Sequence, residues 1–161
     1  MEDLFRSLVA LQDRLRQAGI PSAIIGGMAV GVWGEPRTTR DVDLKVLLKR
    51  HEAQRLLEVI APDYIPLQPD PLQALRRSGV LFVQDRQGTR LDLLLADTSF
   101  DVAAIERARS VELQPGVVAL ICSPEDLIIY KMISTRPRDY EDAESVVRRQ
   151  GDALDDAYVL G

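Results

Sequence analysis

The chain has one cysteine, Cys122, and one histidine, His51. A single cysteine excludes a disulfide within the chain, which agrees with a reducing compartment, and two such residues are too few for a zinc centre of Cys and His ligands. No apolar run approaches the roughly 20 residues needed to cross a bilayer, and the acidic start of the chain does not fit an export signal. We therefore expect a cytoplasmic protein that makes no membrane contact.

An excess of positive charge is also missing. The formal net charge of the 161 residues is -5 and the pI is near 4.9, so overall charge does not attract a polyanion. A nucleic-acid partner would have to be held by local arginines. With 46% hydrophobic residues, length and composition predict a single domain over residues 1–161.

The spacing of apolar residues predicts a chain that mixes helices and strands. Leucines at steps of three and four predict an amphipathic helix over 2–17. A short strand over 23–25 then stops at two glycines, and a short helix follows directly over 28–33. Further signals predict helices over 52–60, 100–107, 123–134 and 137–151, strands over 80–83, 90–95, 111–113 and 117–121, an irregular proline-rich stretch from 62 with one helical turn over 72–77, and an acidic tail after 151.

The most informative feature is a pair of aspartates, Asp41 and Asp43, at the start of the apolar run 41–48. On a strand, residues i and i+2 point to the same face, so the two carboxylates meet at one place while the apolar residues between them enter the core. Like charges held that close raise one another's pKa unless a cation lies between them. The pair therefore fits half of a divalent-metal site.

A third acid, Asp92, lies among leucines in the predicted strand 90–95. An unpaired carboxylate is costly to bury there, so it needs a partner or a function. If this strand lies beside the strand of Asp41 and Asp43, the three carboxylates can hold one or two Mg²⁺ ions, or Mn²⁺ in their place. Two such ions are what phosphoryl-type transfer requires.

The glycine pair Gly26 and Gly27 fits a phosphate-binding turn, which the acids cannot provide. Without side chains, these residues let backbone N–H groups approach phosphate oxygens at the N-terminus of the following helix, where the helix dipole favours negative charge. Each feature also has a purely structural interpretation: a tight turn for the glycines, and a solvated face for the acids. The ordered combination favours a functional site.

At this point the sequence resembles the nucleotidyltransferase-fold superfamily related to DNA polymerase β. Within it, the sequence is most similar to small bacterial enzymes that include AbiEii-type toxins. The resemblance covers residues 23 to 147, and its motifs are Ile24-Ile25-Gly26-Gly27-Met28-Ala29, Arg37-Thr38-Thr39-Arg40-Asp41-Val42-Asp43-Leu44, Leu91-Asp92-Leu93-Leu94, Ser123-Pro124-Glu125-Asp126-Leu127 with Lys131, and Arg136-Pro137-Arg138-Asp139.

The resemblance implies an α/β fold, of the α+β kind, whose mixed sheet carries Asp41, Asp43 and Asp92 as metal ligands and catalytic residues. It also implies an NTP, ATP among them, as the substrate, with a set of binding residues around its phosphates. Where many members have serine, this chain has Gly27, which offers only its backbone. The implied nucleotide-binding residues are Gly26, Gly27, Arg37, Arg40, Lys131, Arg138 and Asp139, with Arg136 beside them.

The resulting expectation is a Mg²⁺-dependent enzyme that moves an NMP from an NTP to an acceptor hydroxyl. The acceptor remains open among an RNA end such as tRNA, a protein and a small molecule, and a toxin–antitoxin role implies an antitoxin partner or a second copy of the chain. One alternative is a non-catalytic module that keeps the fold to bind nucleotide or a partner. Another is a phosphohydrolase or nuclease that uses the same acids with water as the nucleophile.

Overall fold

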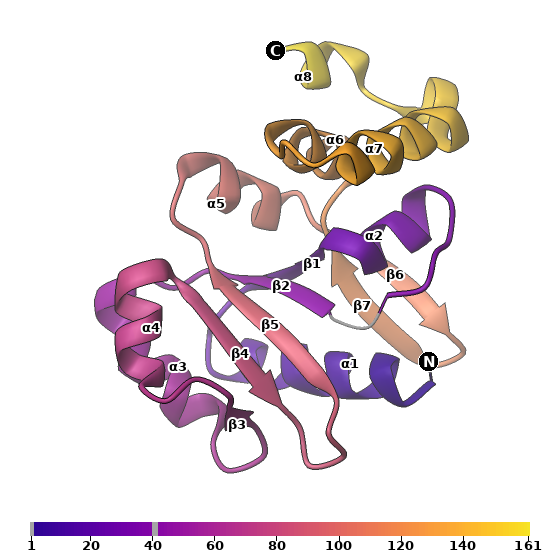
Figure 1. Ribbon diagram of the computed structural model, residues 1–161. Coiled ribbons are helices and arrows are strands. Elements are labelled where there is room, and N and C mark those ends of the chain that lie inside the picture. The colour runs from indigo at the N-terminus through magenta and orange to yellow at the C-terminus, as the bar shows by residue number, and fades with distance from the viewer. Residues whose placement is uncertain (1, 40–41) are drawn as a thin grey trace.

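The computed structural model describes residues 2–39 and 42–161, which form a seven-stranded sheet with helices on both faces (Figure 1). The strand order is β3-β4-β5-β2-β1-β7-β6. β2 runs parallel to β5 and β1 parallel to β7, whereas the other neighbours are antiparallel, so the predicted mixed sheet is confirmed. The strands are β1 (Ser22–Ile25), β2 (Val42–Val46), β3 (Ile65–Pro66), β4 (Val80–Gln84), β5 (Arg90–Leu95), β6 (Arg109–Gln114) and β7 (Val117–Ile121).

The helices divide between the two faces of the sheet. α1 and α3 lie on one face, whereas α2, α5, α6 and α7 lie on the other (Figure 1). Their bounds are α1 (Glu2–Gln17), α2 (Gly26–Trp33), α3 (Ala53–Ile60), α4 (Pro71–Ser78), α5 (Ser99–Glu106), α6 (Pro124–Ile133), α7 (Pro137–Gln150) and α8 (Asp156–Leu160), with short 3-10 helices at Arg50–Glu52 and Gly151–Ala153.

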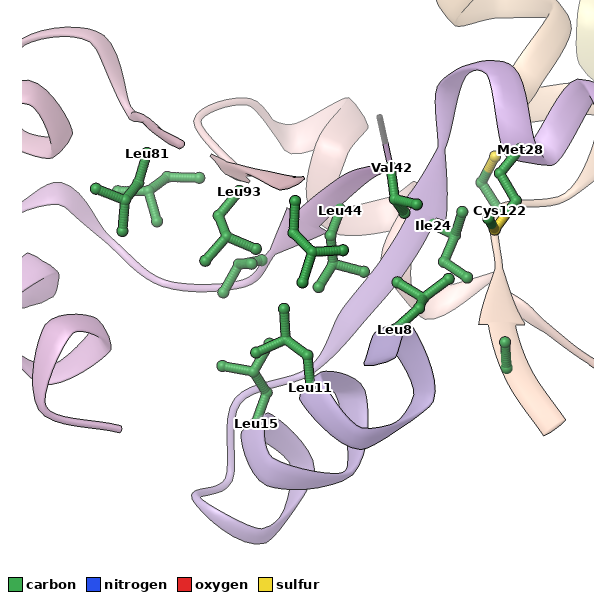
Figure 2. Close-up of a cluster of buried hydrophobic side chains, with 14 of the residues drawn as sticks. Leu8, Leu11, Leu15, Ile24, Met28, Val42, Leu44, Leu81, Leu93 and Cys122 are labelled. Atoms are coloured by element: carbon green, nitrogen blue, oxygen red, sulfur yellow. The ribbon is translucent and has the colours of Figure 1, made fainter. Parts of the chain in front are cut away.

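The main core lies between α1 and the sheet. Leu8, Leu11 and Leu15 form the inner stripe of α1, are fully buried, and face strand residues such as Ile24 and Leu44 (Figure 2). Burying each leucine contributes about 1.5–3 kcal/mol relative to leaving it in water. This stripe is the predicted amphipathic pattern, and it fixes which face of the sheet turns inward.

β2 shows the predicted alternation. Val42, Leu44 and Val46 are fully buried on the α1 side, whereas Asp43 and Lys45 are only partly buried. Because successive strand residues point to opposite faces, Asp43 and Lys45 share the face covered by α5, α6 and α7. The core pattern therefore determines on which side the acids are placed.

Two segments are more ordered than the sequence predicts. The stretch after residue 62 contains β3 and an eight-residue helix α4 rather than one turn, because the Asp70 side chain accepts a hydrogen bond from the Gln73 N–H and Gly79, with a φ of 71°, ends the helix. The acidic tail contains α8, whose Tyr158 hydroxyl donates to Asp126 Oδ1 at 2.6 Å. Across residues 2–39 and 42–161, every helix is too short or too polar to span a bilayer.

Candidate functional site

Asp43 and Asp92 lie directly opposite each other on adjacent parallel strands. Their Cα atoms are register partners in the β2–β5 pairing. Both alternate with fully buried neighbours, so both side chains project from the face of the sheet away from α1. The structure thus brings together two of the three predicted acids, while the third, Asp41, lies outside the described residues, as does Arg40.

Asp92 has a cationic neighbour on its own strand. Arg90 Nε lies 2.9 Å from Asp92 Oδ1, and the Arg90 guanidinium covers the Phe82 ring at 4.5 Å from its centroid. Arg90 is 44% exposed, whereas the Asp92 side chain is 14% exposed. An arginine so exposed can move aside, so this ion pair balances the Asp92 charge without closing access to it.

The glycine turn approaches Asp43 closely. Ile25, the last residue of β1, is the register partner of Asp43, and Gly26 follows it with a φ of 71°. A Cβ on Gly26 would lie 2.3 Å from Asp43 Oδ2, which is impossible without displacing the carboxylate. Gly26 is therefore required twice, for its backbone conformation and for the space that Asp43 occupies.

Gly27 faces a different neighbourhood. A Cβ there would lie 3.0 Å from Thr39 Oγ1 and 3.3 Å from Arg37 Nη2, which is closer than ordinary van der Waals contact. Helix α2 begins at Gly26 without a side-chain cap, and its first turn carries no acidic residue. Its leading N–H groups therefore form a positively polarised end beside the two carboxylates.

Helices α6 and α7 contribute a buried network of charges. Lys131 Nζ lies 2.9 Å from Asp139 Oδ1 and 3.0 Å from Asp142 Oδ2, and its side chain is only 8% exposed. Arg37 binds the same Asp142 through two hydrogen bonds of 3.1 and 3.0 Å, and Arg136 Nε lies 2.9 Å from Asp139 Oδ2. The two carboxylates thus fix three cations along one wall.

These contacts keep both carboxylates ionised. Burial disfavours the charged form of Asp139, but hydrogen bonds from Ser134, from Lys131 and from Arg136 outweigh it and lower the Asp139 pKa to about 2. Burial likewise opposes ionisation of Asp142, and hydrogen bonds from Arg37 and Lys131 lower its pKa. The cations of this wall are therefore held by permanent negative charges at neutral pH.

A second network supports an aromatic ring beside the acids. The Tyr130 hydroxyl donates to Asp101 Oδ1 at 2.6 Å, Lys45 Nζ lies 3.2 Å from the same oxygen, and Phe100 meets the Tyr130 ring edge-on at 4.9 Å between centroids. Burial opposes ionisation of Asp101, but the Tyr130 hydroxyl and the Lys45 ammonium lower its pKa. Burial and the bond to Asp101 raise the pKa of Tyr130, so its hydroxyl stays protonated.

A cavity of about 740 Å³ connects these groups. It contains most of the predicted site residues: both described acids, the two glycines, Arg37, Lys131, Arg138 and Asp139. The lining residues are Ile25, Gly26, Gly27, Arg37, Thr38, Thr39, Asp43, Asp92, Leu127, Tyr130, Lys131, Ser134, Arg136, Arg138 and Asp139.

Four residues that line the cavity or hold its cations were not among the predicted site residues: Thr39, Tyr130, Ser134 and Asp142. A signal existed for Asp142, which follows Asp139 by three positions on a helix and so shares its face. Tyr130 directly precedes the predicted site residue Lys131, but was not itself predicted to line the site. For Thr39 and Ser134 no local pattern distinguishes a cavity residue from an ordinary loop hydroxyl.

The donor groups at the sheet suit a small divalent cation. Among residues 2–39 and 42–161 there is no group of three or more Asp, Glu, His or Cys side chains arranged for a metal ion. Asp43 and Asp92 are two hard oxygen donors in register, and Mg²⁺ is commonly bound by one or two carboxylates together with the substrate's phosphates. The missing Cβ of Gly26 leaves room for the Asp43 carboxylate beside the glycine turn, so the residues present fit Mg²⁺.

No protein-family model and no curated protein sequence matches the chain. Solved structures do match it. One is an antigenic nucleotidyltransferase-like protein from Paracoccidioides brasiliensis, with a TM-score of 0.61 at 19% identity over 91% of this chain and 76% of the other. The chain has the nucleotidyltransferase fold.

Two further nucleotidyltransferase-fold structures are similar along nearly their whole length. The lincosamide antibiotic adenylyltransferase LnuA, with lincomycin bound, matches with a TM-score of 0.56 at 13% identity over 88% of this chain and 94% of the other. ANT(2″)-Ia, in complex with adenylyl-2″-tobramycin, matches with a TM-score of 0.54 at 14% identity over 99% of this chain and 96% of the other. The likeness to the AbiEii-type branch stays a prediction.

Proposed function

We propose that the chain is a Mg²⁺-dependent nucleotidyltransferase that transfers an NMP from an NTP to an acceptor hydroxyl and releases pyrophosphate. The observation that carries this proposal is the pairing of Asp43 with Asp92 in register, beside a glycine turn that opens a helix. In support, two carboxylates and a helix N-terminus without a side-chain cap line one cavity, and these groups suit a divalent cation and a phosphate.

Asp43 and Asp92 would hold Mg²⁺, with Asp41 as the third predicted ligand. When bound, the metal neutralises charge on the phosphates and on the leaving pyrophosphate. In this scheme the Asp92 carboxylate accepts the proton of the acceptor hydroxyl. The support is that Asp92 lines the cavity and, among the described residues, pairs with Arg90, which is 44% exposed. Gly26 and Gly27 present backbone N–H groups to phosphate oxygens.

The cations of the α6–α7 wall supply the remaining phosphate contacts. A lysine ammonium has three donors, and Lys131 uses two of them on Asp139 and Asp142, which leaves one for a phosphate oxygen. Arg37 and Arg138 line the same cavity, and Arg40 is a further predicted contact. In this scheme Asp139 acts through Lys131 rather than on the nucleotide itself.

The structural relatives lend support to more than one acceptor class. LnuA with lincomycin and ANT(2″)-Ia with adenylylated tobramycin favour ATP and a hydroxyl-bearing small molecule. The polyadenylate synthase of Megavirus, with a TM-score of 0.54 at 9% identity over 90% of this chain and 31% of the other, keeps an RNA end among the acceptors. A protein hydroxyl is the third acceptor to test. We also propose a toxin role, in which the chain would bind an antitoxin partner or a second copy of itself.

The test is incubation of the protein with each labelled NTP, Mg²⁺ and cell extract, followed by separation of RNA, protein and small molecules. We expect label in one fraction and release of pyrophosphate, with both lost in Asp43→Asn and Asp92→Asn. Asp152→Asn, at an exposed site outside the cavity, is the matched control. Transfer that persists in Asp43→Asn would refute the proposal, and release of orthophosphate or cut strands in place of pyrophosphate would indicate the hydrolase alternative.

A toxin role has its own readout in living cells. Induced expression of the wild-type chain should arrest growth, and expression of Asp43→Asn at the same level should not, because the arrest depends on the transfer reaction. Growth unaffected by the wild-type chain would count against a toxin role while leaving the transferase activity to the labelling experiment.

A further inference from the structure

Strand register shows in which order the groups of the site lie along β2. In the antiparallel β1–β2 pairing, Ile25 is opposite Asp43 and Ala23 is opposite Lys45, so the glycine turn that follows Ile25 lies toward the N-terminal end of β2. Lys45 lies on the same face two residues further along, about 6.6 Å from Asp43 by the rise of a strand. The carboxylates therefore stand between the glycine turn and Lys45.

Tyr130 marks the Lys45 end of this axis. Lys45 Nζ lies 5.7 Å from the centroid of the Tyr130 ring, which places the ring above that part of β2. Tyr130 lines the cavity, whereas Lys45, Phe100 and Asp101, which contact the ring or its hydroxyl, are not among the lining residues. These three residues support the ring from behind and leave it accessible from the cavity.

The cavity lining contains few apolar residues. Most lining residues are glycines or carry charges and hydroxyls, and the apolar ones are Ile25, Leu127 and Tyr130, with Tyr130 as the aromatic residue among the described lining. The bond to Asp101 and the edge-on contact with Phe100 fix the ring's orientation, so a planar ligand stacks on it without the cost of ordering the side chain.

We propose that Tyr130 is a stacking platform for the base of the nucleoside triphosphate, with the triphosphate at the glycine turn and the reacting phosphate at Asp43 and Asp92. This inference rests on the proposed function and names the part of the substrate that binds at the Lys45 end of the cavity axis. An aromatic face accepts any base, so the platform contributes affinity for nucleotides over base-free polyphosphates.

The test compares two probes, ATP and inorganic tripolyphosphate, each with Mg²⁺, by calorimetry. Wild-type protein should bind ATP more tightly than tripolyphosphate. Tyr130→Leu, which keeps apolar volume and removes the ring, should weaken ATP binding about tenfold and leave tripolyphosphate binding unchanged. Tyr130→Phe, which keeps the ring and loses the bond to Asp101, should stay within about twofold of wild type for both probes.

The control is Tyr140→Leu, the same substitution on α7 at a side chain that is 48% exposed and outside the cavity lining. It should change neither affinity. The inference is overturned if Tyr130→Leu weakens both probes equally or neither, or, should that variant not fold, if wild-type protein binds ATP and tripolyphosphate equally well. Wild-type protein that binds neither probe would overturn the proposed function as well, so the two failures are distinguishable.

Discussion

Arg37 and Asp142, 105 positions apart in the sequence, are joined by two parallel hydrogen bonds of 3.1 and 3.0 Å. Arg37 belongs to the loop between α2 and β2, and Asp142 to the middle of α7. The same loop is bound twice more to α7, since the Ser145 hydroxyl accepts from the Glu35 N–H at 3.2 Å and Arg149 donates to the Gly34 carbonyl at 2.6 Å. Helix α7 thus anchors the segment that leads into the acidic strand.

Loss of Asp142 should weaken both the fold and the cavity wall. Asp142→Ala leaves Arg37 and buried Lys131 without their shared partner, and we expect the free energy of unfolding to fall by about 2 kcal/mol in urea titrations. Glu144→Ala on the same helix removes an exposed pair with Arg148 and should cost less than about 0.5 kcal/mol. Equal losses in the two variants would contradict the anchoring role of Asp142.

Replacement of Gly26 separates backbone strain from the clash with Asp43. Gly116→Ala places alanine at a φ of 78° with no atom within 4 Å, so it should cost about 1 kcal/mol from strain alone. Gly26→Ala adds a Cβ at 2.3 Å from Asp43 Oδ2, so we expect a larger loss of stability and at least a tenfold loss of transfer. Urea titration measures the loss of stability and the labelling assay the loss of transfer. Similar stability losses at both glycines would show that the Asp43 carboxylate moves away from the added Cβ at little cost in free energy.

The stability of the α6–α7 wall should depend on pH in a defined direction. The pKa of Asp139 is lowered from 3.8 to about 2 in the folded protein, so its stabilising effect is present above pH 4 or so and is lost as the pH falls through about 2. The difference in unfolding free energy between wild type and Asp139→Asn should therefore narrow over that interval. A gap at Asp139 that widens in acid would show the opposite linkage.

Magnesium should stabilise the folded protein through Asp43 and Asp92. A ligand that binds the folded state alone raises the unfolding midpoint with its concentration, so Tm should rise on titration with Mg²⁺ and return on addition of EDTA. Asp43→Asn and Asp92→Asn should abolish most of this rise, since each removes one of two hard oxygen ligands. A rise of the same size in both variants would place the Mg²⁺ site elsewhere.

Much of this architecture could be predicted because its signals are local. The leucine spacing of α1, the hairpin of β4 and β5 and the Ser123 cap of α6 each depend on residues close together in the sequence, and each appears as predicted. The proline-rich stretch and the acidic tail were predicted less well. The predicted helical turn is a full helix because both of its caps are present, and α8 is held by a distant contact between Tyr158 and Asp126.

The sequence alone determined which residues could form the site: two acids at alternating strand positions, a third among leucines, and a glycine pair between a strand and a helix. These follow from the period of two along a strand and from the conformational freedom of glycine. Tertiary structure decided which of them meet, because the register of β2 with β5 aligns Asp43 with Asp92, and because α7 returns to the α2–β2 loop to hold Arg37 and Lys131 on one carboxylate. Such contacts between residues far apart in the sequence depend on how whole elements pack, and no local pattern encodes that packing.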